Sequence, residues 1–259
     1  MAQENNYKIE DFDKEVLREY DIRGIVGKNI NENTAYTIGR TFGYTVKSKL
    51  QSNNIVTGYD GRLTSPVLHR ALCEGLKDSG ATVINVGMGP TPMIYFADYF
   101  LNTNAAIMVT GSHNPSEYNG FKMVFNKHSF FANDIQSLQK LIDNNELELL
   151  EGHIIKKNII QNYIDRDLSN INLTRELKIA WDIGNGAMGT VIKKMTEKLS
   201  NSKNIIINEE VDGNFPNHHP DPTIPENMEQ LIEVVKKNNC DLGLAFDGDG
   251  DRLGVVDNL

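Results

Sequence analysis

The stretch that decides the fold is Ala105-Ala106-Ile107-Met108-Val109-Thr110-Gly111-Ser112-His113-Asn114-Pro115, an apolar run that passes directly into a turn. A short apolar run bounded by turn residues predicts a buried strand, and the residues after it predict the turn. Ser112 therefore stands at the end of a buried strand among small and turn-forming residues. A serine in that place is suited to chemistry rather than to filling space.

The same rhythm of apolar runs and amphipathic stretches continues along the chain. Asn119-Gly120 predicts a tight turn, and a helix is predicted to begin at Ser65, with the serine as its cap. The other predicted helices are residues 132–144, 187–199 and 225–239, and the predicted strands are residues 55–59, 81–86, 105–109, 121–125, 177–183, 205–208, 241–246 and 253–257. Such alternation favours layered α/β domains with largely parallel central sheets.

Composition indicates an ordinary globular chain of 259 residues, 39% hydrophobic and 24% charged. A polar stretch at residues 151–157 predicts a boundary between two domains, residues 1–153 and 154–259. The net charge of -9 argues against nucleic acid or an anionic membrane as a partner. Cys73 and Cys240 lie far apart, and no apolar run is long enough to span a bilayer. We therefore expect a cytoplasmic protein with free thiols.

Three aspartates, Asp247, Asp249 and Asp251, follow a predicted strand on alternate residues. Ligands bind at the carboxyl ends of strands in open α/β sheets. Three carboxylates so close repel one another without a cation, and the intervening glycines free the backbone to turn them toward one point. An EF-hand loop is excluded, because Arg252 and Asn258 occupy the positions of its glycine and glutamate. The pattern predicts Mg²⁺ beside a phosphate; the alternative is a solvated acidic turn.

Ser112 does not fit a hydrolase. A nucleophile elbow needs glycines where this chain has Thr110 and Asn114, and His113 adjoins the serine in sequence, a poor arrangement for a base. A serine that carries a phosphoryl group fits better, because small neighbours expose the hydroxyl and Lys122 follows closely. The alternative is an ordinary turn.

The segment Gly184–Gly189 is a GxGxxG motif between a predicted strand and helix, and Glu209 and Glu210 follow the next strand. This is most of a dinucleotide-binding fingerprint; the alternative is a tight turn in which glycine permits close packing. Nothing near the motif suggests a hydride-transfer site. His218 and His219 are a weak metal candidate, because the side chains of adjacent residues usually diverge.

Several basic residues stand in turn-like settings. Taken singly, Arg18, Arg23 and Arg62 are typical surface or ion-pair residues. Together with Lys122 and Arg252 they can concentrate the positive charge that a phosphorylated substrate requires.

These motifs resemble those of the α-D-phosphohexomutases, and within them the bacterial phosphomannomutase/phosphoglucomutase branch. The resemblance runs from about residue 16 to the last residue, and its motifs are Arg18–Gly24, Gly87–Pro92, Thr110–Pro115, Tyr118–Lys122, Asp212–Pro220 and Asp247–Arg252. It implies two consecutive three-layer α/β/α domains with mixed, mostly parallel sheets. It also implies that the glycine turn binds no dinucleotide.

The resemblance implies an enzyme that interconverts hexose 1-phosphate and 6-phosphate, of mannose, glucose or both, through phosphoserine and a 1,6-bisphosphate. The implied catalytic residues are Ser112, Lys122, Arg252, His113 and Arg23, the substrate-binding residues are Tyr20, Arg23, Lys122 and Arg252, and the metal ligands are Ser112, Asp247, Asp249 and Asp251. Lys122 would shuttle protons, and His113 would support the serine loop. The implied cofactors are Mg²⁺ and glucose 1,6-bisphosphate or mannose 1,6-bisphosphate as activator and intermediate.

The resemblance also implies four domains of similar size, and residues 1–259 correspond to the first two. The third would read the sugar hydroxyls and the fourth would grip the non-reacting phosphate. Without them we expect a weak or inactive mutase, because an oriented phosphate clamp and closure of the site are main sources of rate. Two alternatives stay open: a non-catalytic phosphosugar- or metal-binding fragment that needs a separate C-terminal polypeptide, and a dinucleotide-dependent oxidoreductase.

Overall fold

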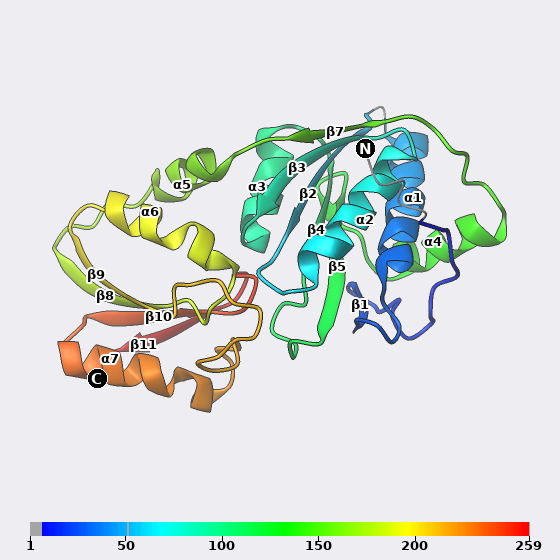
Figure 1. Cartoon of the computed structure of the whole chain (residues 1–259). Helices are drawn as coiled ribbons and strands as arrows, with labels where there is room; N and C mark the ends of the chain where they lie inside the picture. Colours follow the sequence, from blue (N-terminus) through cyan, green and yellow to red (C-terminus); the bar gives the residue numbers. More distant parts are fainter. Residues whose placement is uncertain (1–6, 51, 259) are drawn as a thin grey trace, which may run out of the picture.

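The computed structural model describes residues 7–50 and 52–258, which form two α/β units in succession (Figure 1). The first unit contains β1 (Ile22–Ile25), α1 (Glu32–Lys49), β2 (Asn54–Tyr59), α2 (Ser65–Lys77), β3 (Thr82–Met88), α3 (Thr91–Phe100), β4 (Ala105–Val109), β5 (Tyr118–Phe125), β6 (His128–Ser129), α4 (Asn133–Asp143) and β7 (His153–Lys156). The second contains α5 (Ile160–Leu168), β8 (Leu177–Asp182), η1 (Ala187–Thr190), α6 (Ile192–Lys198), β9 (Ser202–Ile207), η2 (Pro225–Met228), α7 (Glu229–Asn238), β10 (Leu242–Phe246) and β11 (Leu253–Asp257).

Each unit is built on a mixed sheet. In the first sheet the strand order is β1-β5-β4-β2-β3-β7, with β6 added to β5. Strands β4, β2, β3 and β7 run parallel, and β5 is antiparallel to both β1 and β4. In the second sheet the order is β11-β10-β8-β9, and only β11 is antiparallel. The predicted class of mixed, mostly parallel α/β sheets is confirmed.

Helices cover both faces of the first sheet, which explains the continuous apolar run of β4. Ile107 of β4 packs with Phe42 and Leu72 in a core under α1 and α2. The neighbouring Met108 points to the opposite face and packs with Ile94 of α3. A strand buried on both faces reads as unbroken apolar sequence instead of alternating. The strand is therefore held from both sides, and the turn that leaves it starts from a fixed point.

The two units share a core. The cluster around α3 continues into the second unit through Ile164 of α5, Met188 of η1 and Ile192 of α6. On the other face of the second sheet, Leu231 and Val235 of α7 form a separate cluster. Both units thus have the three layers that the resemblance implied. The shared core also fixes the carboxyl ends of the two sheets relative to each other.

Two local predictions are wrong. Ser65 does not cap α2: Thr64 is the cap residue, and the Ser65 hydroxyl instead donates to Asp60 Oδ1 at 2.5 Å. Asn119-Gly120 is not a turn but part of β5, because the Asn119 side chain donates to Ser65 Oγ at 2.9 Å and β1 packs closely against Gly120. In both places tertiary hydrogen bonds and packing outweighed the local preference, for a helix cap at Ser65 and for a turn at Asn119-Gly120.

The polar stretch at residues 151–157 is not a plain linker, because it contains β7, an exposed strand parallel to β3. The boundary predicted after residue 153 falls inside this strand. The predicted helix at 187–199 begins as the 3-10 turn η1 and becomes α6 only at Ile192. Both cysteines are buried free thiols. In the described part of the chain, no helix combines the length and apolarity that crossing a membrane requires.

Candidate active site

Ser112 lies where the loop after β4 meets the loop after β10. Its Oγ donates a hydrogen bond of 3.0 Å to Asp247 Oδ2. Both loops leave the carboxyl ends of strands, the edge of an α/β sheet at which ligands bind. The structure therefore brings together the serine and aspartate motifs, which come from different units of the fold.

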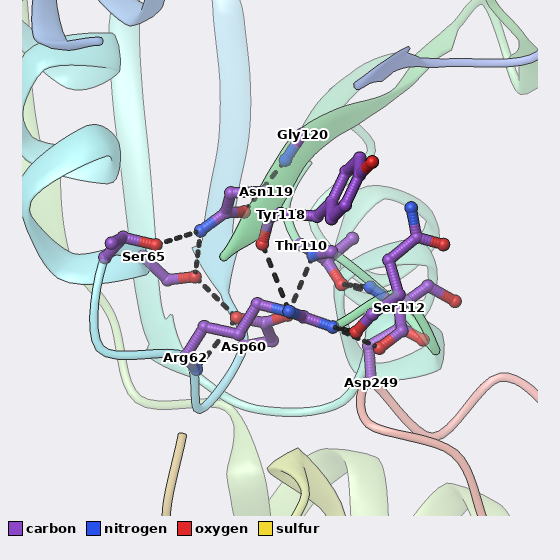
Figure 2. A network of polar contacts seen from close by, with 12 residues as sticks. Asp60, Arg62, Ser65, Thr110, Ser112, Tyr118, Asn119, Gly120 and Asp249 are labelled. Carbon is purple, nitrogen blue, oxygen red and sulfur yellow. Dashed lines mark hydrogen bonds and ion pairs between the residues drawn. The ribbon is translucent and has the colours of Figure 1, made fainter. Parts of the chain in front are cut away.

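The Ser112 backbone adopts a left-handed conformation with φ of 50°. Its amide donates to Thr110 Oγ1 at 2.8 Å, a local contact that helps to hold this turn (Figure 2). Ser112 is only 2% exposed, so the prediction of an exposed hydroxyl is wrong for this state. Asp247 and Lys122 lie against the hydroxyl. Ser112 nevertheless lines an open cavity of about 320 Å³.

Asp247, Asp249 and Asp251 gather as the sequence predicted. One carboxylate oxygen from each lies within 4.8 Å of the others, and only Asp251 is exposed. Asp247 Oδ1 accepts the backbone amides of Asp251 and Arg252 at 3.0 and 3.1 Å, which closes the loop on itself. This tight turn aims the three carboxylates at one point beside Ser112.

The aspartate cluster fits a hard divalent cation. Asp249 Oδ1 is buried, and no hydrogen-bond donor reaches it among the described residues. An orphaned carboxylate oxygen in a protein interior is costly unless a cation meets it. Burial, followed by the charges of Asp249 and Asp251, raises the pKa of Asp247 above its usual range. The three aspartates and the Ser112 oxygen are hard oxygen ligands of the kind that Mg²⁺ and Ca²⁺ take.

Lys122 is the direct counter-charge of this cluster. Its Nζ lies 2.8 Å from Asp249 Oδ2, 2.5 Å from Asp251 Oδ2 and 3.5 Å from Ser112 Oγ. Burial would lower the pKa of Lys122, but the two carboxylates outweigh it and raise the pKa above its usual value. Burial likewise would raise the pKa of Asp249, yet Lys122 and Thr91 bring it to about 2. Lys122 is therefore a cation that touches the serine hydroxyl.

His113 also reaches the serine, although adjacent residues rarely do so. Its Nδ1 lies 3.3 Å from Ser112 Oγ. Burial, and then the charge of Arg252, lower the pKa of His113 below its usual value. The imidazole is therefore neutral near pH 7 and supports the serine loop without adding charge.

Basic and aromatic side chains form the rim of the cavity. The lining consists of Arg18, Tyr20, Asp21, Arg23, Ser112, His113, Lys122, Asp251 and Arg252. Arg23 donates to Asn114 Oδ1 at 3.0 Å and pairs with Asp21. The Arg252 side chain is 40% exposed and lies 4.0 Å from Asp221, the limit of an ion pair, so it is available to a ligand. Tyr20 is 75% exposed at the rim. Four basic residues thus face one cavity, as an anionic ligand requires.

Arg62 does not belong to this rim. It is 1% exposed and forms an ion pair of 3.4 Å with Asp60, which is equally buried. Its guanidinium donates to backbone carbonyls of the serine loop (Figure 2). The prediction that Arg62 supplies charge to a substrate is therefore wrong, because the side chain is buried and both of its Nη groups already donate to backbone carbonyls.

The glycine turn at Gly184–Gly189 has a structural explanation. The amide of Gly184 donates to Asp182, that of Asn185 to Asn208, and that of Ala187 to the Gly248 carbonyl in the aspartate loop. The dinucleotide fingerprint requires backbone amides that are free to donate to a pyrophosphate, and these three amides already donate within the protein. A Cβ at Gly186 would lie 2.8 Å from the Gly248 carbonyl oxygen, so glycine permits close packing against the aspartate loop.

His218 and His219 do not form a metal site. His218 Nε2 contacts Asp182 Oδ2 at 2.9 Å, and its Nδ1 contacts the His219 carbonyl at 3.0 Å. The hydrogen bond to Asp182 raises the pKa of His218, against the effect of burial. This histidine ties the loop before η2 to the end of β8.

Sequence reasoning missed the residues that hold Asp249. Thr91 Oγ1 donates to Asp249 Oδ2 at 2.5 Å, and Thr110 Oγ1 lies 3.1 Å from the same oxygen. Thr91 opens α3 and also binds the Asp249 carbonyl through its amide. Its place in the Gly87–Pro92 motif was the available signal. The hydroxyl contacts across the two units could not be inferred from spacing.

Comparison with known sequence families matches both units. Residues 14–148 match the family described as phosphoglucomutase/phosphomannomutase, alpha/beta/alpha domain I. Residues 161–259 match the corresponding domain II. Together the two matches include the serine loop, Lys122 and the aspartate loop.

Individual relatives carry the same family name as these two matches. A phosphomannomutase/phosphoglucomutase of Pseudomonas putida is 46% identical over 244 residues, 94% of this chain and 52% of the relative. A phosphoglucomutase of Neisseria gonorrhoeae is 42% identical, over 94% of this chain and 53% of the relative. A crystal structure of a phosphoglucomutase/phosphomannomutase family protein from Burkholderia thailandensis superposes with a TM-score of 0.90 at 40% identity, over 95% of this chain and 55% of that one. The chain spans about half the length of the curated relatives it matches.

Proposed function

The chain belongs to the phosphoglucomutase/phosphomannomutase family, and we propose that its described residues form the phosphoryl-transfer half of a phosphohexomutase site. The observation that carries this proposal is the convergence of Ser112, Lys122 and the aspartate cluster on one cavity with a basic rim. The substrate class is a hexose 1- or 6-phosphate of mannose or glucose. The relatives named for mannose and for glucose support both sugars as candidates.

In the proposed reaction, phosphorylated Ser112 meets the free hydroxyl of a hexose phosphate. The sugar oxygen forms a bond to phosphorus as the bond from phosphorus to Ser112 Oγ breaks, which yields a hexose 1,6-bisphosphate. The sugar hydroxyl gives up its proton, and Ser112 Oγ gains one. The bisphosphate then reorients in the site and returns its other phosphoryl group to Ser112.

Lys122 is the residue that we assign to proton transfer at Ser112 Oγ. Its Nζ is the cation 3.5 Å from that oxygen. An ammonium there stabilises the negative charge that develops on the leaving oxygen and delivers a proton to it. Because Asp249 and Asp251 fix the ammonium, it is oriented before the reaction starts.

Asp247, Asp249, Asp251 and the Ser112 oxygen would hold Mg²⁺. When bound, Mg²⁺ supplies positive charge to the phosphoryl oxygens during transfer. The protein contributes the ligand oxygens and the orphaned Asp249 Oδ1. One divalent cation together with Lys122 balances three carboxylates, which otherwise leave the cluster strongly negative.

Arg23, Arg252 and Tyr20 are proposed to bind the phosphosugar, and His113 to support the serine loop. Arg252 is the more exposed of these two arginines, whereas Arg23 is oriented by Asn114 and Asp21. Guanidinium groups bind phosphate with paired hydrogen bonds. The four basic side chains of the rim line the same cavity as Ser112. A bisphosphate also needs a grip on its distant phosphate, so we expect residues 1–259 alone to turn over slowly.

Incubation with glucose 1,6-bisphosphate and Mg²⁺ tests the proposal. Intact-mass measurement should show a gain of about 80 Da, the mass of one phosphoryl group, in the wild type and none in Ser112→Ala. A coupled assay with glucose 1-phosphate and mannose 1-phosphate then measures turnover. Phosphate uptake that persists in Ser112→Ala would contradict the assignment. Absence of uptake in the wild type would favour a non-catalytic binding fragment.

A further inference from the structure

We propose that Arg62 is a positioning residue that holds the Ser112 loop in its reactive conformation and couples it to the second unit. This inference rests on the proposed function for its catalytic consequence, and on geometry alone for the positioning. Arg62 is among the largest fully buried side chains of the described residues. No part of it lines the cavity beside Ser112.

The guanidinium gathers four backbone carbonyls of one loop. Its Nη1 donates to the carbonyls of Pro115 and Tyr118 at 2.6 and 3.1 Å. Its Nη2 donates to those of Ser112 and Asn114 at 2.9 and 2.5 Å. Buried carbonyl groups need hydrogen-bond donors, and the guanidinium supplies one to each of these four. The planar fork of arginine meets them together, which a lysine ammonium cannot do.

Asp60 completes the clamp from the other side. Its Oδ2 accepts the Gly111 amide at 3.1 Å and pairs with Arg62 Nε at 3.4 Å. Its Oδ1 accepts the Ser65 hydroxyl, which in turn accepts from Asn119 in β5 (Figure 2). The carboxylate therefore neutralises the buried guanidinium and ties it to α2 and β5.

The serine loop needs such a clamp because its backbone is unfavourable. Ser112 has φ of 50°, a strained conformation for a non-glycine residue that persists only when its surroundings impose it. Without the clamp the loop has cheaper conformations, in which Ser112 Oγ would leave Asp247 and Lys122. Gly111 permits the close approach, since a Cβ there would lie 2.3 Å from Arg62 Nε.

The second unit covers the other face of the guanidinium. The Phe215 ring lies with its centroid 5.4 Å from Arg62 Cζ, a cation–π contact. The same loop packs on the Arg62 turn at Gly213, whose Cβ would lie 2.8 Å from Arg62 Cα. A shift of the second unit would therefore move the group that holds the serine, while the same unit carries the aspartate cluster. Arg62 thus links the two halves of the site.

The test compares Arg62→Lys with a matched control, Arg40→Lys. Arg40 is also buried in the first unit and donates to the carbonyls of Leu147 and Glu148, but it touches no residue of the site. Hydrogen exchange of residues 110–118 in the full chain is the primary readout. We expect exchange there to quicken roughly tenfold or more in Arg62→Lys, in line with several lost hydrogen bonds, and to be unchanged in Arg40→Lys.

The second readout is phosphorylation of Ser112 by glucose 1,6-bisphosphate with Mg²⁺. Arg62→Lys should lower the maximal rate at least roughly tenfold, with little change in the half-saturating concentration, because the substrate-binding rim is intact. Phe215→Ala should shift both readouts the same way by less. Unchanged loop exchange in Arg62→Lys, or an equal change in Arg40→Lys, would overturn the inference. If the wild type takes up no phosphate while the exchange results hold, the proposed function fails and the positioning of the loop stands.

Discussion

Lowering the pH should destabilise the fold through His69, a buried histidine that meets no negative group among residues 7–50 and 52–258. His69 is 4% exposed, and its Nε2 contacts Thr57 Oγ1 at 3.1 Å and Cys73 Sγ at 3.5 Å. Burial raises the pKa of Cys73 to about 12, so the thiol offers no charge. Burial likewise lowers the pKa of His69 to about 4. The folded state therefore keeps this imidazole neutral.

The direction and the size of the pH effect on stability follow from the lowered pKa of His69. An unfolded histidine has a pKa of about 6.5. Between about pH 6.5 and 4 the unfolded state therefore binds more protons than the folded state, and the free energy of unfolding falls as the pH is lowered. One pKa unit corresponds to about 1.36 kcal/mol, which gives a loss of about 1.3 kcal/mol between pH 7.5 and 5.5 and roughly 3 kcal/mol near pH 4. The stabilisation is complete above the unfolded pKa.

Urea unfolding at pH 7.5 and pH 5.5 measures this loss. His69→Gln should lose about 1.3 kcal/mol less than the wild type over this interval. The exposed His128 provides the control, and His128→Gln should follow the wild type. Equal pH dependence in the wild type and His69→Gln would refute the reasoning, because it would mean that His69 is protonated equally in both states.

Three further predictions concern the site and the core. Mg²⁺ should raise the Tm of the wild type in a thermal scan but not that of Asp249→Asn. The control, Asp134→Asn at an exposed position, should respond as the wild type does. At a Mg²⁺ concentration of about 100 times Kd, the free energy of unfolding should rise by roughly 2.7 kcal/mol. Because the hydrogen bond to Asp182 raises the pKa of His218, His218→Gln should cost roughly 1–2 kcal/mol below pH 6.5. This cost should shrink as the pH rises through the folded pKa, and a constant cost from pH 6 to 9 in urea unfolding would argue against the ion pair. Gly75→Ala should destabilise by roughly 1–3 kcal/mol, because its Cβ would lie 2.1 Å from the Tyr36 carbonyl oxygen between α1 and α2; an unaltered urea midpoint would contradict this packing.

The alternation of apolar runs and helices was enough to predict the layered fold. The strand before Ser112 was found within its observed bounds, Ala105–Val109, because a strand buried on both faces leaves an unbroken apolar run. Asn119-Gly120 misled because their turn chemistry is local, while Ser65 and β1 hold them in a strand from afar. Edge strand β7 was missed because its apolar run, Ile154-Ile155, is only two residues long and is too short to predict a strand.

The candidate site, like the fold, was predicted only in part. The serine and aspartate loops were predicted, since each follows a recognisable strand. The role of Arg62 was misjudged, because an arginine in a turn looks the same in sequence whether it faces a substrate or four carbonyls. Thr91 was missed because its contact with Asp249 joins two units of the fold. Sequence patterns report what lies along one strand or helix, and these two residues act between elements.

The most direct test of the account is a single half-reaction. The protein is first phosphorylated with glucose 1,6-bisphosphate and Mg²⁺, freed of small molecules, and then mixed with glucose 6-phosphate. We predict that intact mass falls by about 80 Da as an equal amount of glucose 1,6-bisphosphate appears, and that Lys122→Ala slows this transfer. Release of the group as inorganic phosphate, without any bisphosphate, would contradict the claim that Ser112 transfers its phosphoryl group to a hexose phosphate.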